Sequence, residues 1–337
     1  MNLTPKKMLI AFFAVNCLGA FLVGFSFARY KDLHRKPKVI TEKRINAIAP
    51  GDRLVLTKDE NIFSLTNGKT TQITYDQHVS EPVATSSGYF AIEKKRNYSS
   101  LLLFDAHGAL AQTFLDGSSP KIDHMFWVTE PAVSPDEKKI AFVSDRNRGQ
   151  SGNPDNALFV QDIVQGTPQL IVRPIPYSGG IANPMWDPQM HFLLYTSYTY
   201  DTLTLEPYSI IQLYDMKTRT MTDLTTEEQN AFQATISPDA KKLLFLSRNK
   251  DKNTVTLYSA DFADKQMTNP RALTTGDLAY PRFSNTPDRI YYLHASENSD
   301  YTLMTAEIHE ASISGTLRVP DAAHLKAGPY TVLIEPE

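Results

Sequence analysis

Short apolar runs alternate with polar turns through the chain after residue 50. Residues 139–143 read KIAFV and residues 289–293 read RIYYL, while residues 254–258 (TVTLY) alternate apolar and polar positions. Such runs of β-branched and aromatic residues, bounded by Gly, Pro, Asn, Asp or Ser, predict short antiparallel strands. No stretch of this part shows a sustained helical period, so the pattern predicts an all-β domain.

One unit of this pattern recurs along the chain. Residues 130–143 (EPAVSPDEKKIAFV) match residues 233–246 (QATISPDAKKLLFL), and more distant copies lie at 81–92, 183–195 and 280–292. The equivalent positions are 49, 53, 50 and 47 residues apart: Pro82, Pro131, Pro184, Ala234 and Pro281. A spacing of this length indicates a repeat architecture in which each repeat is one structural unit.

Each repeat divides into four short strands. In the best-preserved copies an apolar run leads into Ser-Pro-Asp, where proline presets the backbone of a turn and aspartate stabilises it through a side-chain hydrogen bond. A second strand, an alternating third strand and a weaker outer strand follow, for example at 139–143, 157–160 and 168–172. Four antiparallel strands per repeat are typical of a propeller blade, so we predict a β-propeller.

The two ends of the repeat region complement each other. Residues 53–75 hold three strands but lack the innermost one, and residues 330–334 hold a single strand. We therefore predict that the C-terminal strand completes the first blade and closes a ring of six, because closure removes exposed sheet edges. The expected fold is an all-β, six-bladed β-propeller closed by the C-terminal strand and preceded by one N-terminal transmembrane helix.

An uncharged hydrophobic segment occupies residues 8–28, after a short tail at 1–7. A helix of this length would measure about 31 Å, which matches a bilayer core of about 30 Å. We expect an uncleaved signal-anchor, although residues 26–28 (SFA) resemble a small-x-small cleavage site and a cleaved signal peptide stays open. The only cysteine, Cys17, lies in this segment, and a basic linker at 29–50 joins it to a propeller at 51–337.

Charge is divided unevenly along the chain. Residues 1–44 carry nine Lys or Arg and two acidic residues, whereas residues 45–337 carry 25 basic and 35 acidic ones. The acidic body argues against nucleic acid as a partner, since phosphate binding needs a basic surface. The basic stretch at 29–44 would stay cytoplasmic under the positive-inside rule, so a cytoplasm-facing propeller stays open beside an exported one.

The repeat resembles the WD40-like repeat of the TolB family. Residues 134–139 (SPDEKK) and 237–242 (SPDAKK) carry the Ser-Pro-Asp turn followed by a basic pair. The resemblance implies a periplasmic propeller that binds another protein of the cell envelope; TolB itself binds a peptidoglycan-associated lipoprotein. TolB carries an α/β domain before its propeller, and the linker at 29–50 leaves no room for one.

This resemblance leads us to expect a membrane-tethered, extracytoplasmic module that binds a protein or glycan partner and needs no cofactor. The alternative is a glycan-active or metal-binding propeller enzyme, a lyase or hydrolase, that uses the mouth of the channel. The sequence contains no G-x-S-x-G motif, which the serine peptidases with related propellers require. We therefore predict no catalytic residue.

The residue before each equivalent position is the candidate binding residue. We place it at the start of the innermost strand in five repeats: Glu81, Glu130, Asn183, Gln233 and Tyr280. Because innermost strands line the channel of a propeller, these side chains are expected to cluster at one channel mouth and to hold a cation, an amine or a basic peptide. The alternative is a set of solvated or turn-capping residues at loop ends.

Two histidines lie in the loops that approach the same strands. His78 and His124 could join Glu81 and Glu130 in a metal site, because imidazole and carboxylate suit several transition metals. Their spacing is irregular, with His78 four residues and His124 seven residues before the equivalent proline, which favours ordinary loop positions.

Aromatic residues near the channel mouth are a further candidate surface. Trp127 and Trp186 could stack on a sugar or anchor a partner, but we expect them to pack between blades. The tyrosine-rich residues 195–208 (YTSYTYDTLTLEPY) are either an exposed recognition surface or ordinary strand formers.

Overall fold

The computed structural model describes residues 47–334 apart from gaps at 67–68, 121, 123, 148–155, 176–177, 250–253, 296–299, 310–311, 320–321 and 327. The predicted membrane segment at 8–28 and most of the predicted linker at 29–50 lie outside the described residues. Within the described ranges, no helix combines the length and the hydrophobicity that a membrane crossing requires.

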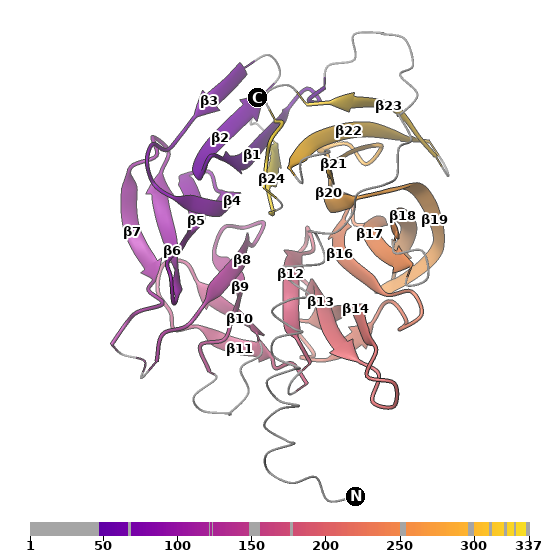
Figure 1. Cartoon of the computed structure of the whole chain (residues 1–337), viewed down its shortest axis with the longest axis horizontal. Coiled ribbons are helices and arrows are strands. Elements are labelled where there is room, and N and C mark those ends of the chain that lie inside the picture. Colours follow the sequence, from indigo (N-terminus) through magenta and orange to yellow (C-terminus); the bar gives the residue numbers. More distant parts are fainter. Residues whose placement is uncertain are drawn as a thin grey trace, which may run out of the picture.

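The described residues form six four-stranded antiparallel sheets around a common centre (Figure 1). We number these sheets as blades, each given from the channel outward. Blade 1 consists of β24 (Thr331–Ile334), β1 (Asp52–Lys58), β2 (Asn61–Thr66) and β3 (Lys69–Gln72). Blade 2 consists of β4 (Val79–Ala84), β5 (Gly88–Lys94), β6 (Ser99–Asp105) and β7 (Leu110–Leu115). Blade 3 consists of β8 (Val128–Val133), β9 (Lys139–Ser144), β10 (Ala157–Asp162) and β11 (Gln169–Val172).

The second half of the ring repeats this order. Blade 4 consists of β12 (Gly180–Trp186), β13 (Phe192–Tyr200), β14 (Pro207–Asp215) and β15 (Met221–Asp223). Blade 5 consists of β16 (Ala231–Ile236), β17 (Lys242–Asn249), β18 (Thr254–Ala263) and β19 (Gln266–Gly276). Blade 6 consists of β20 (Leu278–Phe283), β21 (Arg289–Ala295), β22 (Tyr301–His309) and β23 (Ser312–Arg318). The all-β, six-bladed propeller is therefore confirmed for the described part of the chain.

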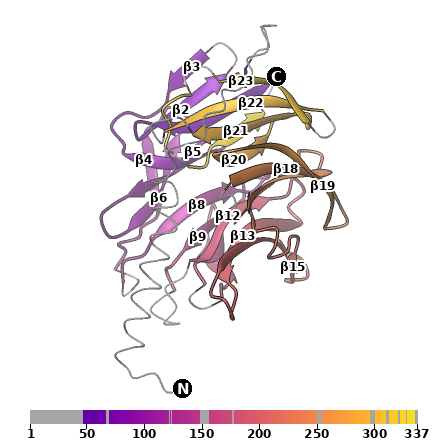
Figure 2. The same cartoon turned by 45° about the vertical axis from the view of Figure 1, so that its right-hand side comes forward.

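The ring is closed by the C-terminal strand, as predicted. Strand β24 pairs antiparallel with β1, with Val332 opposite Leu54 and Thr331 opposite Val55. The closing strand lies at the channel side of blade 1. The oblique view of Figure 2 shows β2 and β3 of blade 1 next to β22 and β23 of blade 6. Closure satisfies the inner edge of β1, which would otherwise be open to pairing with another chain.

The Ser-Pro-Asp turns form as the sequence predicts. In blade 3 the Ser134 hydroxyl donates to Asp136 Oδ1 at 2.6 Å and accepts the backbone N–H of Lys139 at 2.9 Å. Blade 5 repeats this arrangement, with Ser237 donating to Asp239 at 2.6 Å. These turns join the innermost strand to the second strand, and we call the side of the propeller that carries them the turn face. The loops that join consecutive blades lie on the opposite side, the loop face.

The core lies between the blades. Each pair of neighbouring blades shares one cluster of buried apolar side chains in the described structure. Between blades 2 and 3, for example, Phe90 packs in one cluster with Phe142, and Tyr291 of blade 6 packs with Leu54 of blade 1. The blades are thus held to one another by packing between their sheets. The turn face and the loop face consist of the turns and loops that connect the strands.

Candidate functional site

The five predicted binding residues occupy equivalent positions within the innermost strands. They lie inside the strands and not at their start, because each sits at a β-bulge where the register with the second strand shifts. Each also has a left-handed backbone, with φ of 54°, 52°, 54°, 52° and 49° for Glu81, Glu130, Asn183, Gln233 and Tyr280. A bulge leaves one residue outside the ladder and bends the strand, so it redirects these side chains. The sequence placed the residues correctly relative to one another but did not reveal the bulge.

The bulges connect each blade to the next through side-chain-to-backbone hydrogen bonds. Glu81 of blade 2 accepts the backbone N–H of Glu130 in blade 3 at 2.6 Å. Glu130 in turn accepts the backbone N–H of Asn183 in blade 4, and its second oxygen accepts Asn183 Nδ2 at 3.2 Å. Each of the two carboxylates therefore accepts a hydrogen bond from a main-chain N–H group of the following blade.

The same pattern continues through blades 4 to 6. The Thr196 hydroxyl donates to Asn183 Oδ1 at 3.4 Å and accepts the N–H of Gln233 at 3.0 Å. Gln233 Oε1 accepts the N–H of Tyr280 at 2.7 Å. The five predicted residues are thus joined by one series of hydrogen bonds that runs from blade 2 to blade 6, and we call this set of residues the channel ring. The ring lies near the loop-face end of the innermost strands.

Blade 1 joins the channel ring differently. The equivalent position in the sequence is Gly328, which precedes the closing strand β24 and has no side chain to accept a hydrogen bond. The link to blade 2 comes from the Thr331 hydroxyl, which donates to the Pro82 carbonyl at 2.9 Å. This contact joins the closing strand of blade 1 to the innermost strand of blade 2.

Two carboxylates lie close together in the channel ring. Burial, followed by the negative charge of Glu81, raises the pKa of Glu130 to about 7. Glu81 is only 6% exposed, and its second oxygen accepts Lys94 Nζ at 2.6 Å. The Lys94 side chain is half exposed, so it offers one positive charge at the rim. The channel mouth is therefore a mixed polar surface and not a purely acidic one.

Sequence reasoning missed a guanidinium that faces the same cluster. Arg282 follows Tyr280 by two positions, and its guanidinium lies 6.0 Å from the ring centre of Tyr330. Burial lowers the pKa of Arg282, while the nearby Tyr330, Tyr280 and Glu130 raise it. Burial and the charges of Glu130 and Glu81 hold the pKa of Tyr280 well above its usual value. One signal was present in the sequence, because the other repeats have Val83, Ala132, Met185 and Thr235 at the Arg282 position.

The two predicted metal-binding histidines have separate surroundings. His78 Nδ1 lies 2.7 Å from Glu60 on the β1–β2 turn, and both side chains are exposed. His124 lies in the loop before β8 and is partly buried. No group of three or more His, Cys, Asp and Glu side chains able to hold a metal ion occurs among the described residues. The metal site therefore stays a prediction without structural support.

The two tryptophans have different surroundings: Trp186 packs between blades, and Trp127 lies in the loop before β8 on the loop face. Trp186 is 5% exposed, and its Nε1 donates to the Ala132 carbonyl of the neighbouring blade at 2.9 Å. This confirms the expected packing between blades for Trp186. Trp127 is partly buried, and its backbone N–H donates to Asp145 at 2.6 Å.

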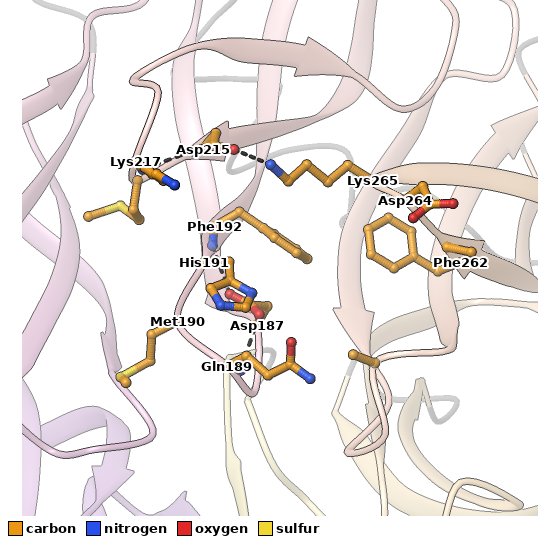
Figure 3. Close-up of a pocket in the computed structure, with 13 residues that line it drawn as sticks. Asp187, Gln189, Met190, His191, Phe192, Asp215, Lys217, Phe262, Asp264 and Lys265 are labelled. Atoms are coloured by element: carbon orange, nitrogen blue, oxygen red, sulfur yellow. Dashed lines mark hydrogen bonds and ion pairs between the residues drawn. The ribbon is translucent and has the colours of Figure 1, made fainter.

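A hollow of about 670 Å³ lies on the turn face between blades 4 and 5 (Figure 3). Phe192 and Phe262 line it with apolar surface, and Lys265 reaches across to form an ion pair with Asp215 (Figure 3). This pair and two backbone N–H groups hold the pKa of Asp215 below its usual value. Asp187 accepts the N–H of Phe192 at 2.8 Å and so stabilises the turn that borders the hollow. These two carboxylates therefore have structural partners.

Comparison with solved structures identifies the architecture. TolB from Acinetobacter baumannii superposes with a TM-score of 0.60 at 15% identity, over 83% of this chain and 66% of that one. A TolB-type protein from Agrobacterium tumefaciens gives 0.58 at 12% identity, over 85% of this chain and 99% of that one. An oligogalacturonate lyase in complex with manganese gives 0.54 at 14% identity, over 75% of this chain and 69% of that one.

These similarities show a TolB-like propeller fold. The chain spans just under two thirds of the Acinetobacter TolB chain and nearly all of the Agrobacterium one. No protein-family model matches the chain, and no curated protein sequence matches it. At these identities the likeness establishes architecture, and function has to be argued from the site.

Proposed function

We propose that this protein is a binding module of the cell envelope that recognises a protein or glycan partner at the channel mouth on its loop face. The TolB-like fold supports a binding role, and the resemblance of the repeat to the TolB family implies a periplasmic location. In this proposal residues 8–28 anchor the chain in a membrane, residues 29–50 link the anchor to the propeller, and residues 51–337 form the recognition domain outside the cytoplasm.

The channel ring is the observation that carries this proposal. Its carboxylates accept backbone N–H groups of the next blade, so they are held in one geometry before any ligand arrives. A rim that is already ordered loses little conformational entropy when a partner docks on it. Lys94 at the rim and Arg282 beside Tyr280 add positive charge to the two carboxylates, which suits a partner with charges of both signs.

The position of the N-terminal end of the propeller indicates which face would point toward a membrane anchor. Asp52, at the start of β1, contacts Ser284 and Asn285 in the turn between β20 and β21. The chain therefore enters the propeller at the turn face. An anchor that precedes this point would join the turn face, and it would leave the loop face free to meet a partner.

The test uses the full-length protein in its native envelope. Crosslinked affinity capture of the wild type is compared with Glu81→Gln/Glu130→Gln, which removes both charges but keeps an acceptor oxygen for the next blade. We expect one specific partner with the wild type and about tenfold less of it with the double variant, because charged groups in an interface set its specificity. The matched control, Glu137→Gln/Glu307→Gln, removes two charges away from the channel and should retain the partner.

The outcomes distinguish an error in the proposed binding site from an error in the proposed function. Equal recovery with both double variants would move the recognition site away from the channel mouth. Absence of any specific partner with the wild type would contradict a binding function.

One observation favours the enzymatic alternative. Glu130 is partly buried, and its pKa of about 7 suits a general acid or base at neutral pH. Both of its oxygens accept hydrogen bonds from Asn183, which is equally consistent with a structural role. Incubation with oligogalacturonate and Mn²⁺, the substrate and metal of the similar lyase, discriminates the two. Cleavage by the wild type that is lost in Glu130→Gln would favour the enzyme.

A further inference from the structure

The hairpin formed by β13 and β14 is longer than its equivalents in blades 2 and 3 and similar to that of blade 5. Each of its strands has nine residues, whereas β5 and β6 have seven, β9 and β10 have six, and β17 and β18 have eight and ten. The two strands stay paired to their ends, where Tyr200 lies opposite Pro207. The hairpin therefore carries its tip, residues 201–206, out on the loop face of blade 4.

Hydrogen bonds close the tip into one conformation. Asp201 Oδ1 accepts the backbone N–H groups of Leu203 and Thr204 at 2.8 and 2.6 Å. The Asp201 carbonyl accepts the N–H of Leu205 at 2.8 Å, and its own N–H donates to the Glu206 carbonyl at 2.9 Å. An aspartate that caps its own loop in this way defines the loop geometry. The tip is thus a specific structure built on paired strands.

Two leucines project from this ordered tip. Leu203 is 92% exposed and Leu205 is 69% exposed. Leu205 also has a left-handed backbone with φ of 60°, a conformation that favours Gly, Asn or Asp over leucine. The loop therefore holds an apolar side chain in water and in a strained backbone, a combination that folding alone does not favour.

Acidic residues lie on the tip and on the neighbouring loop. Residues 197–216 and 220–240 contain no Lys, Arg or His. Glu206 lies on the tip, and Glu227 and Glu228 lie on the loop between β15 and β16, which is bonded to the hairpin through Ser209 and Asn230 at 3.0 Å. Burial, and then Glu227 and Asp201, raise the pKa of Tyr208, which lies directly below the tip, and this places both carboxylates near it.

We infer that residues 201–206 form a docking knob for a protein partner that offers an apolar pocket rimmed by Lys or Arg side chains. The exposed leucines would fill the pocket, and Glu206, Glu227 and Glu228 would pair with its rim. Apolar anchors inside a polar rim are the usual anatomy of a protein interface. A bacterial membrane surface is a poorer match, because anionic head groups repel the surrounding carboxylates.

This inference rests on the proposed binding function and names a second contact surface for it. The knob and the channel ring lie on the same face of the propeller, so one partner can reach both. The channel ring and the knob are nevertheless separate sets of residues, and each can be removed without changing the other.

The test places a photoreactive residue on the knob of the full-length protein in its native envelope. Leu203 is replaced by p-benzoylphenylalanine, and irradiation should give one protein adduct whose crosslinked peptide contains apolar residues flanked by Lys or Arg. Adding Glu206→Lys/Glu227→Lys should lower the adduct yield about tenfold, as expected for reversed charge in an interface. Adding Leu205→Asp should lower it similarly while preserving the fold, since aspartate tolerates the left-handed backbone.

Val164 provides the matched control. It is 87% exposed in the turn between β10 and β11, on the turn face, and the photoreactive residue there should give no such adduct. Vesicles of phosphatidylglycerol and phosphatidylethanolamine provide the second control, and the protein without its membrane segment should not float with them.

Four results would overturn the inference. These are no adduct at residue 203, an adduct with lipid, an adduct with a second copy of this chain, and a protein adduct that is insensitive to charge reversal. If capture through the channel mouth succeeds while the knob gives no adduct, only this inference fails. If neither experiment yields a partner, the proposed function fails as well.

Discussion

The carboxylate of Asp52 accepts a hydrogen bond of 2.7 Å from the hydroxyl of Tyr291, which lies 239 residues later in the chain. The same carboxylate accepts the Ser284 hydroxyl at 2.5 Å and the Asn285 N–H at 2.9 Å. In blades 3 and 5 the equivalent serine bonds to an aspartate within its own turn. In blade 6 the position two residues after the serine is Thr286, and Asp52 takes over the bond to the serine. This contact links blades 6 and 1 in addition to the closing strand.

Replacing Asp52 by alanine should destabilise the whole ring. Asp52 is 2% exposed, and the substitution leaves the Ser284 and Tyr291 hydroxyls and the Asn285 N–H without their acceptor. Unsatisfied buried donors make the expected loss in the free energy of unfolding on the order of 3 kcal/mol. Urea denaturation followed by tryptophan fluorescence measures it.

Asp288 provides the control for this prediction. It lies in the same turn with its side chain largely exposed, and it faces Lys242 at 3.5 Å. Asp288→Ala should leave the urea midpoint almost unchanged. Equal midpoints for the Asp52 and Asp288 variants would show that the Asp52 network does not hold the ring.

The closing strand should be separable and replaceable. A chain ending at Pro329 lacks β24, so the inner edge of β1 from Asp52 to Val55 loses its partner. We expect a lower thermal midpoint and self-association through this edge. The peptide PYTVLIEPE, residues 329–337, should reverse this self-association by adding a strand to the open edge.

A scrambled peptide of the same composition should not rescue the shortened chain. Light scattering and the thermal midpoint together report the effect. A shortened chain that associates no more than the full-length chain and keeps the same thermal midpoint would contradict the role of β24.

The left-handed backbone in the channel ring predicts an inverted order of alanine and glycine at Gln233. Both Gln233→Ala and Gln233→Gly remove the acceptor for the Tyr280 N–H. With φ of 52° at this position, glycine fits without strain, so the glycine variant should be more stable than the alanine variant by about 1 kcal/mol. Denaturant unfolding of the two variants measures the difference.

Gln212 tests whether this order is specific to the bulge. It lies in β14, paired with Tyr195 in a regular ladder. There the usual order should hold, with alanine more stable than glycine. The same order at both positions would mean that the bulge backbone carries no such preference.

Glu130 predicts a pH dependence of stability. Its pKa in the folded protein is about 7 against an ordinary value of 4.5, so between these values the folded state binds more protons than the unfolded state. Stability from this group is present in full below pH 4.5 and is lost as the pH rises through 7. The wild type should therefore lose on the order of 3 kcal/mol over this range relative to Glu130→Gln, which does not titrate.

Urea denaturation of both proteins at a series of pH values measures this difference. Parallel stability curves for the wild type and Glu130→Gln would contradict the raised pKa. The comparison does not depend on the absolute stability of either protein.

The channel ring shows how far sequence reasoning reached into the site. The repeat spacing placed Glu81, Glu130 and Asn183 at equivalent positions on neighbouring blades, and the structure brings them together. The spacing did not show that Glu81 and Glu130 accept the backbone N–H of the next residue in the series, because that depends on the bulge and on how the blades are tilted. Arg282 was missed for a related reason, since one basic residue in one repeat does not form a pattern.

The docking knob illustrates the same limit. Residues 195–208 were open to two interpretations, because tyrosine and threonine serve equally well in a buried strand or an exposed surface. The structure shows that both interpretations apply to different parts of this segment. Tyr195 in β13 is 1% exposed, whereas Leu203 at the tip of the hairpin is 92% exposed.

The sequence by itself determined the six blades, the Ser-Pro-Asp turns and the closing strand, because these depend on local turn chemistry and on a spacing repeated along the chain. The tertiary structure alone decided the bulges of the channel ring, the role of Asp52 and the exposure of the knob. Each of these depends on groups from different strands or blades, and such contacts arise only when the ring has closed and the blades have packed.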